Sequence, residues 1–225
     1  MYFSIHNGET KQWGEFMRIG VIQASSQSGK NELLYCCTCK AVERNSRNDE
    51  VINSGVFRDE NVTFTYVETA VNISLLLASG TVDFIVTGCS SGQGMMLACN
   101  NVPGVLCGYV PTPMDAYLFA QINDGNAVSV PLGEEYTWQG KENLEQTVEK
   151  LFSEPFGQGY PKSEAERKKK DTLLLKEIRK NSQVSISEFL AALPKDLVEK
   201  IRTKENVLTW IRENGKDPDI LAWLR

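Results

Sequence analysis

The chain has 225 residues, 41% of them hydrophobic, so it can bury the core of one large domain or of a domain with an appendage. Its net charge of −5 argues against a dedicated nucleic-acid-binding protein, which usually carries a basic surface. No apolar run approaches the roughly 20 residues of a membrane span, and residues 1–16 lack the pattern of a signal peptide. We therefore expect a soluble, cytoplasmic protein that binds neither nucleic acid nor membranes.

Apolar runs typical of buried strands alternate with segments of helical spacing over residues 17–160, after an N-terminal extension at 1–16 with little periodicity. The predicted strands are 18–23, 50–53, 82–87, 105–110 and 127–131, and the predicted helices are 30–44, 66–79, 94–100, 112–123 and 143–152. Such alternation favours parallel strands covered by helices on both faces. The sequence therefore predicts an α/β fold with a Rossmann-like, doubly wound, five-stranded parallel sheet.

The composition changes after Phe152, where a turn-rich link leads into a basic and then apolar C-terminal part. Ser163 and Ser185 each open a capping-box pattern, in which a serine is followed three residues later by glutamate. Trp210 and Trp223 stand among apolar residues that look like one packing surface. We interpret residues 161–225 as a helical C-terminal appendage.

Two polar turns follow predicted strands, and in doubly wound sheets ligands bind outside the carboxyl ends of the strands. The first turn, residues 24–31, resembles a phosphate loop. However, Ala24 replaces its first glycine and Asn31 replaces its magnesium-binding hydroxyl. A polar loop that faces a ligand is the preferred interpretation, an ordinary solvated turn is the second, and a nucleotide-binding module is a weaker alternative.

The second turn, Gly88-Cys89-Ser90-Ser91-Gly92-Gln93-Gly94, is rich in glycine and enters a predicted helix. Such turns bring backbone N–H groups close to an anion or a developing oxyanion. A thiolate at the start of a helix could remove a proton from carbon or act as a nucleophile. A buried cysteine in a tight turn is the competing interpretation.

Other cysteine and histidine chemistry has little support. His6 is the only histidine, which weakens any catalytic triad or histidine-based metal site. The Cys36-Cys37-Thr38-Cys39 cluster has no second ligand pair at zinc-site spacing, so we interpret these cysteines as small buried side chains of a helix. We expect all six cysteines to be reduced.

Taken in order, the motifs resemble the sugar-phosphate isomerase family that contains ribose-5-phosphate isomerase type B and the subunits of galactose-6-phosphate isomerase. The family loop C-G-T-G-x-G and the following A-x-N find matches at residues 89–94 and 98–100. Its P-G-[IV] turn matches residues 103–105, and its H-N-D-x-N segment matches residues 122–126. The resemblance covers residues 18–160.

The resemblance implies an aldose–ketose isomerase that acts on a sugar phosphate, ribose 5-phosphate or a related sugar, without metal or organic cofactor. Cys89 would be the general base that moves a proton between C1 and C2 through an enediolate, and Ser91, at a threonine position, would contact the sugar. The resemblance also implies a homodimer or homotetramer whose sites take residues from two chains. The positions that would bind the substrate are Ser25, Tyr66, Ser90, Gly92, Gly94, Asn100, Asn123 and Asp124.

The chain also departs from the family pattern. An aspartate–histidine pair after the first strand corresponds to Ala24-Ser25, and a second histidine corresponds to Ile122, so ring opening has no assigned group. Lys162 and Arg167 are the candidates for phosphate binding, with a solvated basic helix start as the competing interpretation. A non-catalytic sugar-phosphate-binding or regulatory protein on the same scaffold is the alternative function.

Overall fold

Five strands of this computed structural model pair in parallel, as the sequence predicts, in the order β4-β3-β5-β7-β6. The structure describes residues 3–6, 9–12 and 16–225, the first two ranges by their backbone. The strands of the parallel sheet are β3 (Arg18–Ile22), β4 (Glu50–Gly55), β5 (Phe84–Cys89), β6 (Cys107–Tyr109) and β7 (Ala127–Pro131). This is the predicted Rossmann-like α/β fold.

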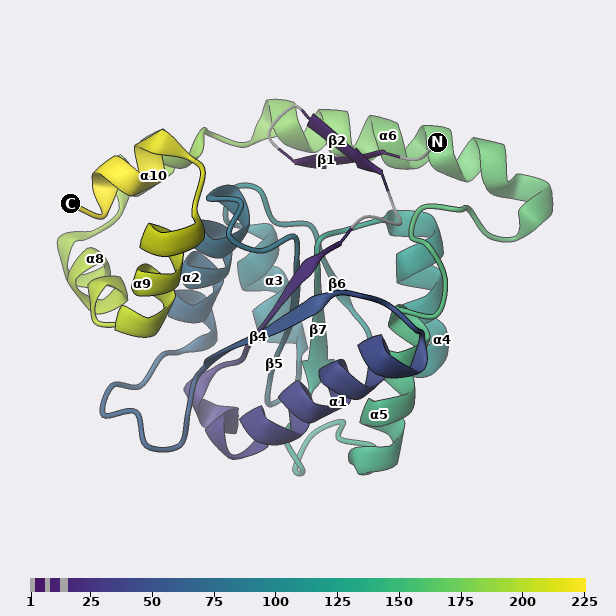
Figure 1. The fold of residues 1–225 in the computed structure, drawn as a ribbon, viewed down its shortest axis with the longest axis horizontal. Helices are drawn as coiled ribbons and strands as arrows, with labels where there is room; N and C mark the ends of the chain where they lie inside the picture. Colours follow the sequence, from purple (N-terminus) through teal and green to yellow (C-terminus); the bar gives the residue numbers. More distant parts are fainter. Residues whose placement is uncertain (1–2, 7–8, 13–15) are drawn as a thin grey trace.

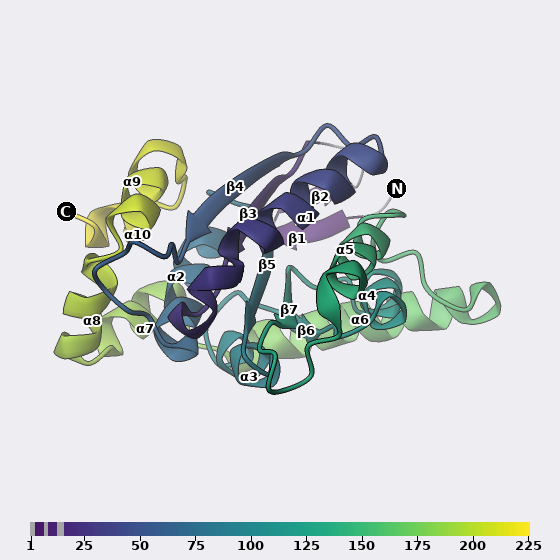
Figure 2. The same ribbon diagram turned by 90° about the horizontal axis from the view of Figure 1, so that it is seen from below.

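Helices cover both faces of the sheet (Figures 1 and 2). One face packs against α2 (Tyr66–Ala78) and α3 (Gln93–Asn100), whose buried side chains form one hydrophobic cluster with Ile22 and Ile85. The other face packs against α1 (Asn31–Arg44), α4 (Pro113–Leu118) and α5 (Gly140–Leu151), which form a second cluster. Because every residue of β5 and β7 is buried, these strands read as continuous apolar runs.

The central strand β5 begins later than predicted. The N–H groups of Thr81 and Val82 bond to the carbonyl of Leu76, so these two residues still belong to the turn after α2. At its other end the strand extends through Cys89, which pairs with Pro131 of β7. Cys89 is therefore held by the sheet itself.

Three further segments differ from the sequence prediction. The extension contains an antiparallel pair, β1 (Phe3–His6) and β2 (Glu9–Gln12). The sequence did not predict this pair, because strands of four residues are too short to show a period. The predicted helix 112–123 consists of α4 and a separate π-helical turn, η2 (Phe119–Asn123). The prediction that Ser163 caps a helix is wrong, since this residue lies inside a 3₁₀ turn, η3 (Lys162–Glu164), that precedes the helix.

The C-terminal part is helical, as predicted. Ser185 forms the predicted capping box with Glu188, whose N–H and carboxylate both bond to it. The helices are α6 (Ala165–Ser182), α7 (Ile186–Ala192), α8 (Lys195–Arg202), α9 (Glu205–Asn214) and α10 (Pro218–Trp223). Across the described parts of the chain, no helix combines the length and the apolar character of a membrane span.

The C-terminal helices share a hydrophobic core with the sheet domain. Leu208 and Ile211 of α9 belong to the same buried cluster as Leu76 and Leu77 of α2. Figure 1 shows α8, α9 and α10 gathered beside α2, with α6 running along the top of the molecule. The C-terminal helices after residue 161 and the sheet domain before it are thus two segments of the chain that share one hydrophobic core.

This shared core predicts a single cooperative unfolding transition. Truncating the fully buried Ile211 to alanine should lower the free energy of unfolding of the whole chain by about 2–5 kcal/mol, because it removes contacts on both sides of the boundary. Urea unfolding followed by tryptophan fluorescence and by far-UV circular dichroism should give coincident curves. Two separated transitions, with only one shifted in Ile211→Ala, would contradict the shared core.

Candidate active site

Three loops meet at the carboxyl edge of the sheet and are joined by backbone hydrogen bonds. The N–H of Ala24, after β3, donates to the carbonyl of Gly88 at 3.1 Å. The N–H groups of Leu132 and Gly133, after β7, donate to the carbonyls of Cys89 and Ser90 at 3.0 and 2.9 Å. The thiol and the glycine-rich turn are therefore placed by main-chain geometry.

Cys89 itself is largely covered. Its side chain is 6% exposed and belongs to the hydrophobic cluster that includes Ala24 and Met95. Beside this turn lies Tyr66, the first residue of α2, which is 44% exposed; a methyl group on Gly94 would lie 3.5 Å from its ring. The exposed ring of Tyr66 therefore borders the turn, next to Gly94.

The turn after Cys89 presents hydroxyl and N–H groups at this edge. Ser90 and Ser91 are half-buried, and the Ser90 hydroxyl accepts a hydrogen bond from Gln27 at 3.0 Å. Gly92 has the left-handed φ of 76° and caps α3, so the next N–H groups point out of the helix start. The first N–H groups of a helix have no intrahelical partner and attract negative charge.

Ser25 shapes the edge through the backbone. Its hydroxyl accepts the N–H of Phe64 at 2.6 Å, and its own N–H donates to the Phe64 carbonyl at 2.9 Å. The next residue, Thr65, caps α2 in a capping box with Glu68. Ser25 therefore fixes the approach of the chain to Tyr66.

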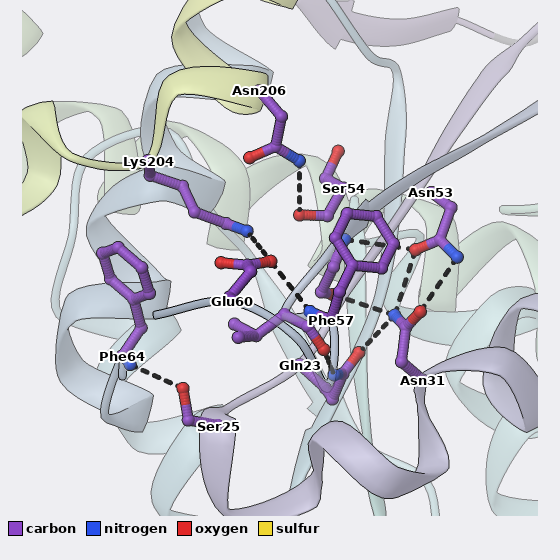
Figure 3. A network of polar contacts seen from close by, with 12 residues as sticks. Gln23, Ser25, Asn31, Asn53, Ser54, Phe57, Glu60, Phe64, Lys204 and Asn206 are labelled. Atoms are coloured by element: carbon purple, nitrogen blue, oxygen red, sulfur yellow. Dashed lines mark hydrogen bonds and ion pairs between the residues drawn. The ribbon is translucent and has the colours of Figure 1, made fainter. Parts of the chain in front are cut away.

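The 3₁₀ turn η1 (Ser25–Lys30) does not reproduce a phosphate loop. The Asn31 amide, at the position of the magnesium-binding hydroxyl, donates to the Gln23 side chain and to the Gly55 carbonyl at 2.8 and 3.1 Å. Figure 3 shows this buried amide network, which ties the ends of β3 and β4 together. Sequence reasoning missed this structural role of Asn31 because its partners lie at the ends of two strands, β3 and β4.

Lys30, the lysine of the phosphate-loop pattern, pairs with a carboxylate instead. Its ammonium group pairs with Glu134 at 2.7 Å and lies 4.6 Å from the centre of the Trp138 ring, so it bridges the loops after β3 and β7. The hydrogen bond from Lys30 lowers the pKa of Glu134 below its usual value. This pair places a cation and an anion beside the candidate site.

Three of the predicted substrate-binding residues lie at the opposite, amino edge of the sheet. Asn100 ends α3, and its side-chain amide bonds to both backbone groups of Cys107 at the start of β6. Asn123 and Asp124 end η2 just before β7, and Asp124 pairs with Lys176 of α6 at 2.5 Å. Within one chain these residues do not approach Cys89.

The candidate phosphate-binding residues also lie away from Cys89. The link before them is tied to η2, since the N–H groups of Gly157 and Gly159 donate to carbonyls of that segment. Arg167 pairs with Glu164 and Asp171 at 2.7 and 2.9 Å. Figure 1 shows α6 beginning at the far side of the molecule from the carboxyl ends of the strands.

The hollow on the other face of the sheet and the cysteine cluster on α1 do not form a site. A hollow of about 410 Å³ lies between α1 and α5, but its residue Glu145 is paired with Arg44 and Lys40. Among residues 3–6, 9–12 and 16–225, no three His, Cys, Asp or Glu side chains gather as a metal site. In the cysteine cluster on α1, Cys37 is buried as predicted, whereas Cys36 and Cys39 are half-buried.

Comparisons with known proteins agree with this architecture. The sequence pattern of the Ribose/Galactose Isomerase family matches residues 35–170. The solved structure of a 4-deoxy-L-threo-5-hexosulose-uronate ketol-isomerase, complexed with a tartrate, is 34% identical, with a TM-score of 0.86, covering 92% of this chain and 97% of its own. A ribose-5-phosphate isomerase from Vibrio parahaemolyticus is 30% identical, with a TM-score of 0.85, covering 93% and 98%.

A more distant structure matches a smaller share of the chain. A type B ribose 5-phosphate isomerase from Trypanosoma cruzi is 22% identical, with a TM-score of 0.58, and covers 73% of this chain and 99% of its own, which is a likeness of fold. The two nearer structures each cover more than nine-tenths of this chain, so they share most of its helical C-terminal part. A search of curated proteins found no match.

Because β7 approaches the turn after Cys89 closely, we predict that position 92 has no room for a side chain larger than that of glycine. A methyl group at Gly92 would lie 2.7 Å from the Tyr109 ring and 2.9 Å from the Pro131 nitrogen. Gly92→Ala should therefore cost about 1–3 kcal/mol in the free energy of unfolding beyond the cost of its left-handed backbone. Urea unfolding measures this cost.

Gly104→Ala is the matched control for this prediction. Gly104 has nearly the same φ, 75°, but no atom within 4 Å of the added methyl group. Gly104→Ala should lower the free energy of unfolding by only about 1–2 kcal/mol, the cost of placing alanine in the left-handed conformation. Equal losses in the two variants would contradict a steric role for Gly92.

Proposed function

Because the chain belongs to the Ribose/Galactose Isomerase family, we propose that it is an aldose–ketose isomerase of an open-chain sugar phosphate, ribose 5-phosphate or a related sugar. The observation that carries the proposal is the position of Cys89, which ends the central strand and is followed at once by the turn that opens α3. This arrangement sets one potential base beside a row of backbone N–H groups.

In the proposed reaction the Cys89 thiolate removes the proton from C2 of the aldose. The electron pair of that C–H bond forms the C1–C2 double bond of an enediolate, and the carbonyl oxygen at C1 takes the negative charge. The N–H groups of the turn, from Ser90 to Gly94, stabilise this oxyanion. A proton passes from the C2 hydroxyl to the C1 oxygen, the C2 carbonyl forms, and the proton held by Cys89 returns to C1. The product is the ketose, so hydrogen moves between neighbouring carbons without a redox partner or cofactor.

The other residues of the carboxyl edge would bind the sugar. The Ser91 hydroxyl lies in the turn itself and would contact a hydroxyl near the reacting carbons. Tyr66, largely exposed beside Gly94, would cover the chain of the sugar. Burial of Cys89 fits this role, because exclusion of water strengthens the electrostatic stabilisation of the enediolate.

We further propose that a neighbouring subunit of a homodimer or homotetramer completes the site. Asn100, Asn123, Asp124, Lys162 and Arg167 lie at the far edge of their own chain, where they could serve only another subunit. Exposed apolar residues of α6 offer a surface for such association: Leu173, Leu174, Leu175 and Ile178. A monomer at assay concentration that turns over sugar at full rate would contradict this arrangement.

The substrate could carry a carboxylate in place of the phosphate. The relative that is 34% identical acts on a uronate, whose end group is a carboxylate rather than a phosphate. Lys30, which pairs with Glu134 in this structure, could exchange that partner for either anion. We keep the sugar phosphate as the first proposal, because the ribose-5-phosphate isomerase from Vibrio parahaemolyticus is similar over the same length.

The general-base role predicts a large loss in Cys89→Ala. Proton exchange between solvent D₂O and C2 of the sugar should fall by about 10²–10⁴-fold, because the variant lacks the proposed general base. Nuclear magnetic resonance of the sugar measures the exchange. Cys36→Ala, which changes a half-buried cysteine on the outer helix α1, is the control and should exchange at the wild-type rate. Undiminished exchange in Cys89→Ala would remove the thiol from the mechanism.

A substrate panel tests the sugar class and the non-catalytic alternative together. Ribose 5-phosphate should be isomerised with a higher kcat/KM than 4-deoxy-L-threo-5-hexosulose-uronate, and the reverse order would assign the uronate. The alternative, a sugar-phosphate-binding or regulatory protein, is favoured by Ala24, whose buried side chain cannot open a sugar ring. It predicts that the sugars raise the melting temperature without turnover of any of them.

A further inference from the structure

Lys204 is a buried cation that the isomerase chemistry above does not use. It lies between α8 and α9 and is 1% exposed, yet its ammonium group reaches the carboxyl end of β4 (Figure 3). There it pairs with Glu60 and lies 5.5 and 5.6 Å from the centres of the Phe57 and Phe64 rings. Burial lowers the pKa of Lys204, and the hydrogen bond with Glu60 opposes that effect.

The ion pair is built tightly into the loop after β4. Glu60 also accepts the N–H of Phe57 at 2.8 Å, so the carboxylate closes a turn of the loop on itself. A methyl group at Gly55 would lie 2.5 Å from the Glu60 oxygen and 2.9 Å from the Lys204 nitrogen. Because a buried charge is costly without its partner, removal of either member should release the loop.

This loop leads directly to the candidate site. The ring of Phe64 faces the Lys204 ammonium group, and its backbone is bonded to Ser25 in both directions. Two residues further, Tyr66 lies beside Gly94 in the turn after Cys89, where a methyl group on Gly94 would be 3.5 Å from its ring. A second link from α9, the hydrogen bond from the Asn206 amide to the Ser54 carbonyl at 3.1 Å, holds the start of the same loop.

We propose that Lys204 is a positioning residue for the candidate active site, through which the C-terminal helices hold the loop at 55–65, and with it Tyr66, against the turn after Cys89. Its effect on turnover rests on the proposed isomerase function. The state of the loop can be read without any substrate, because Arg58 is an exposed trypsin site within it.

The test compares Lys204→Met with Lys200→Met. Lys200 lies on α8 and its ammonium group is 5.6 Å from the same Phe64 ring, but it is half-exposed and Glu60 pairs with Lys204 instead. Cleavage after Arg58 should be at least about tenfold faster in Lys204→Met, and within about twofold of wild type in Lys200→Met. KM for the sugar that the wild type converts should rise about tenfold in Lys204→Met, with kcat within about threefold.

Rescue by the second substitution separates positioning from general destabilisation. In Glu60→Gln/Lys204→Met no buried charge is left unpaired, and the amide oxygen can still accept the Phe57 N–H. Cleavage after Arg58 and KM should both return to within about threefold of wild type. If Lys204→Met does not fold, Glu60→Gln alone is expected to accelerate cleavage and raise KM in the same direction.

Three results would overturn the proposal. One is wild-type cleavage after Arg58 in folded Lys204→Met or Glu60→Gln. Another is faster cleavage in Lys204→Met with an unchanged KM, which would mean that Lys204 holds the loop but does not position the site. The third is a raised KM that the double variant does not restore. If the wild type converts no sugar, the isomerase proposal fails while the proteolysis result still decides whether Lys204 holds the loop.

Discussion

Parallel pairing of β3, β5 and β7 is the constraint on which the rest of the molecule depends. Val21 lies opposite Val86, and Val86 opposite Val128. β3 ends one residue after Val21, whereas β5 and β7 continue together to the Cys89–Pro131 pair. Backbone hydrogen bonds between their loops then fix the main chain at Cys89, whose side chain packs in the cluster that includes Ala24 and Met95. Close approach leaves no space for side chains at some positions, and a methyl group at Gly88 would lie 2.5 Å from the Val130 carbonyl.

The two edges of this sheet carry different kinds of polar groups. At the carboxyl edge, hydroxyl and N–H groups remain half-exposed around the turn that follows Cys89. At the amino edge, the amides of Asn100 and Asn126 bond to backbone at the start of β6, and Arg179 of α6 donates to the carbonyls of Asn100 and Val105. The candidate residues around Cys89 thus lie at one edge of the sheet, whereas Asn100 and Asp124 lie at the other.

The C-terminal helices contribute both apolar packing and polar contacts to the rest of the molecule. Leu208 and Ile211 extend the core over α2, whereas Lys204 and Asn206 bond to the loop after β4. A buried ion pair gives little net stability compared with apolar packing, but it fixes one geometry because an unpaired charge is so unfavourable. The same helices thus stabilise the fold and limit how the edge next to Cys89 can move.

The order of strands and helices along the chain, and the placement of Cys89 at a strand end, were predictable from the sequence because apolar periodicity and glycine-rich turns act over a few residues. The same patterns did not predict the short strands of the extension or the 3₁₀ turn that contains Ser163, because each spans only three or four residues. Only the tertiary structure decided that Asn31 ties two strands, that Asn123 and Asp124 lie away from the thiol, and that Lys204 is buried against Glu60. These facts join residues as far as 144 positions apart, and no local pattern encodes which distant groups a folded chain brings together.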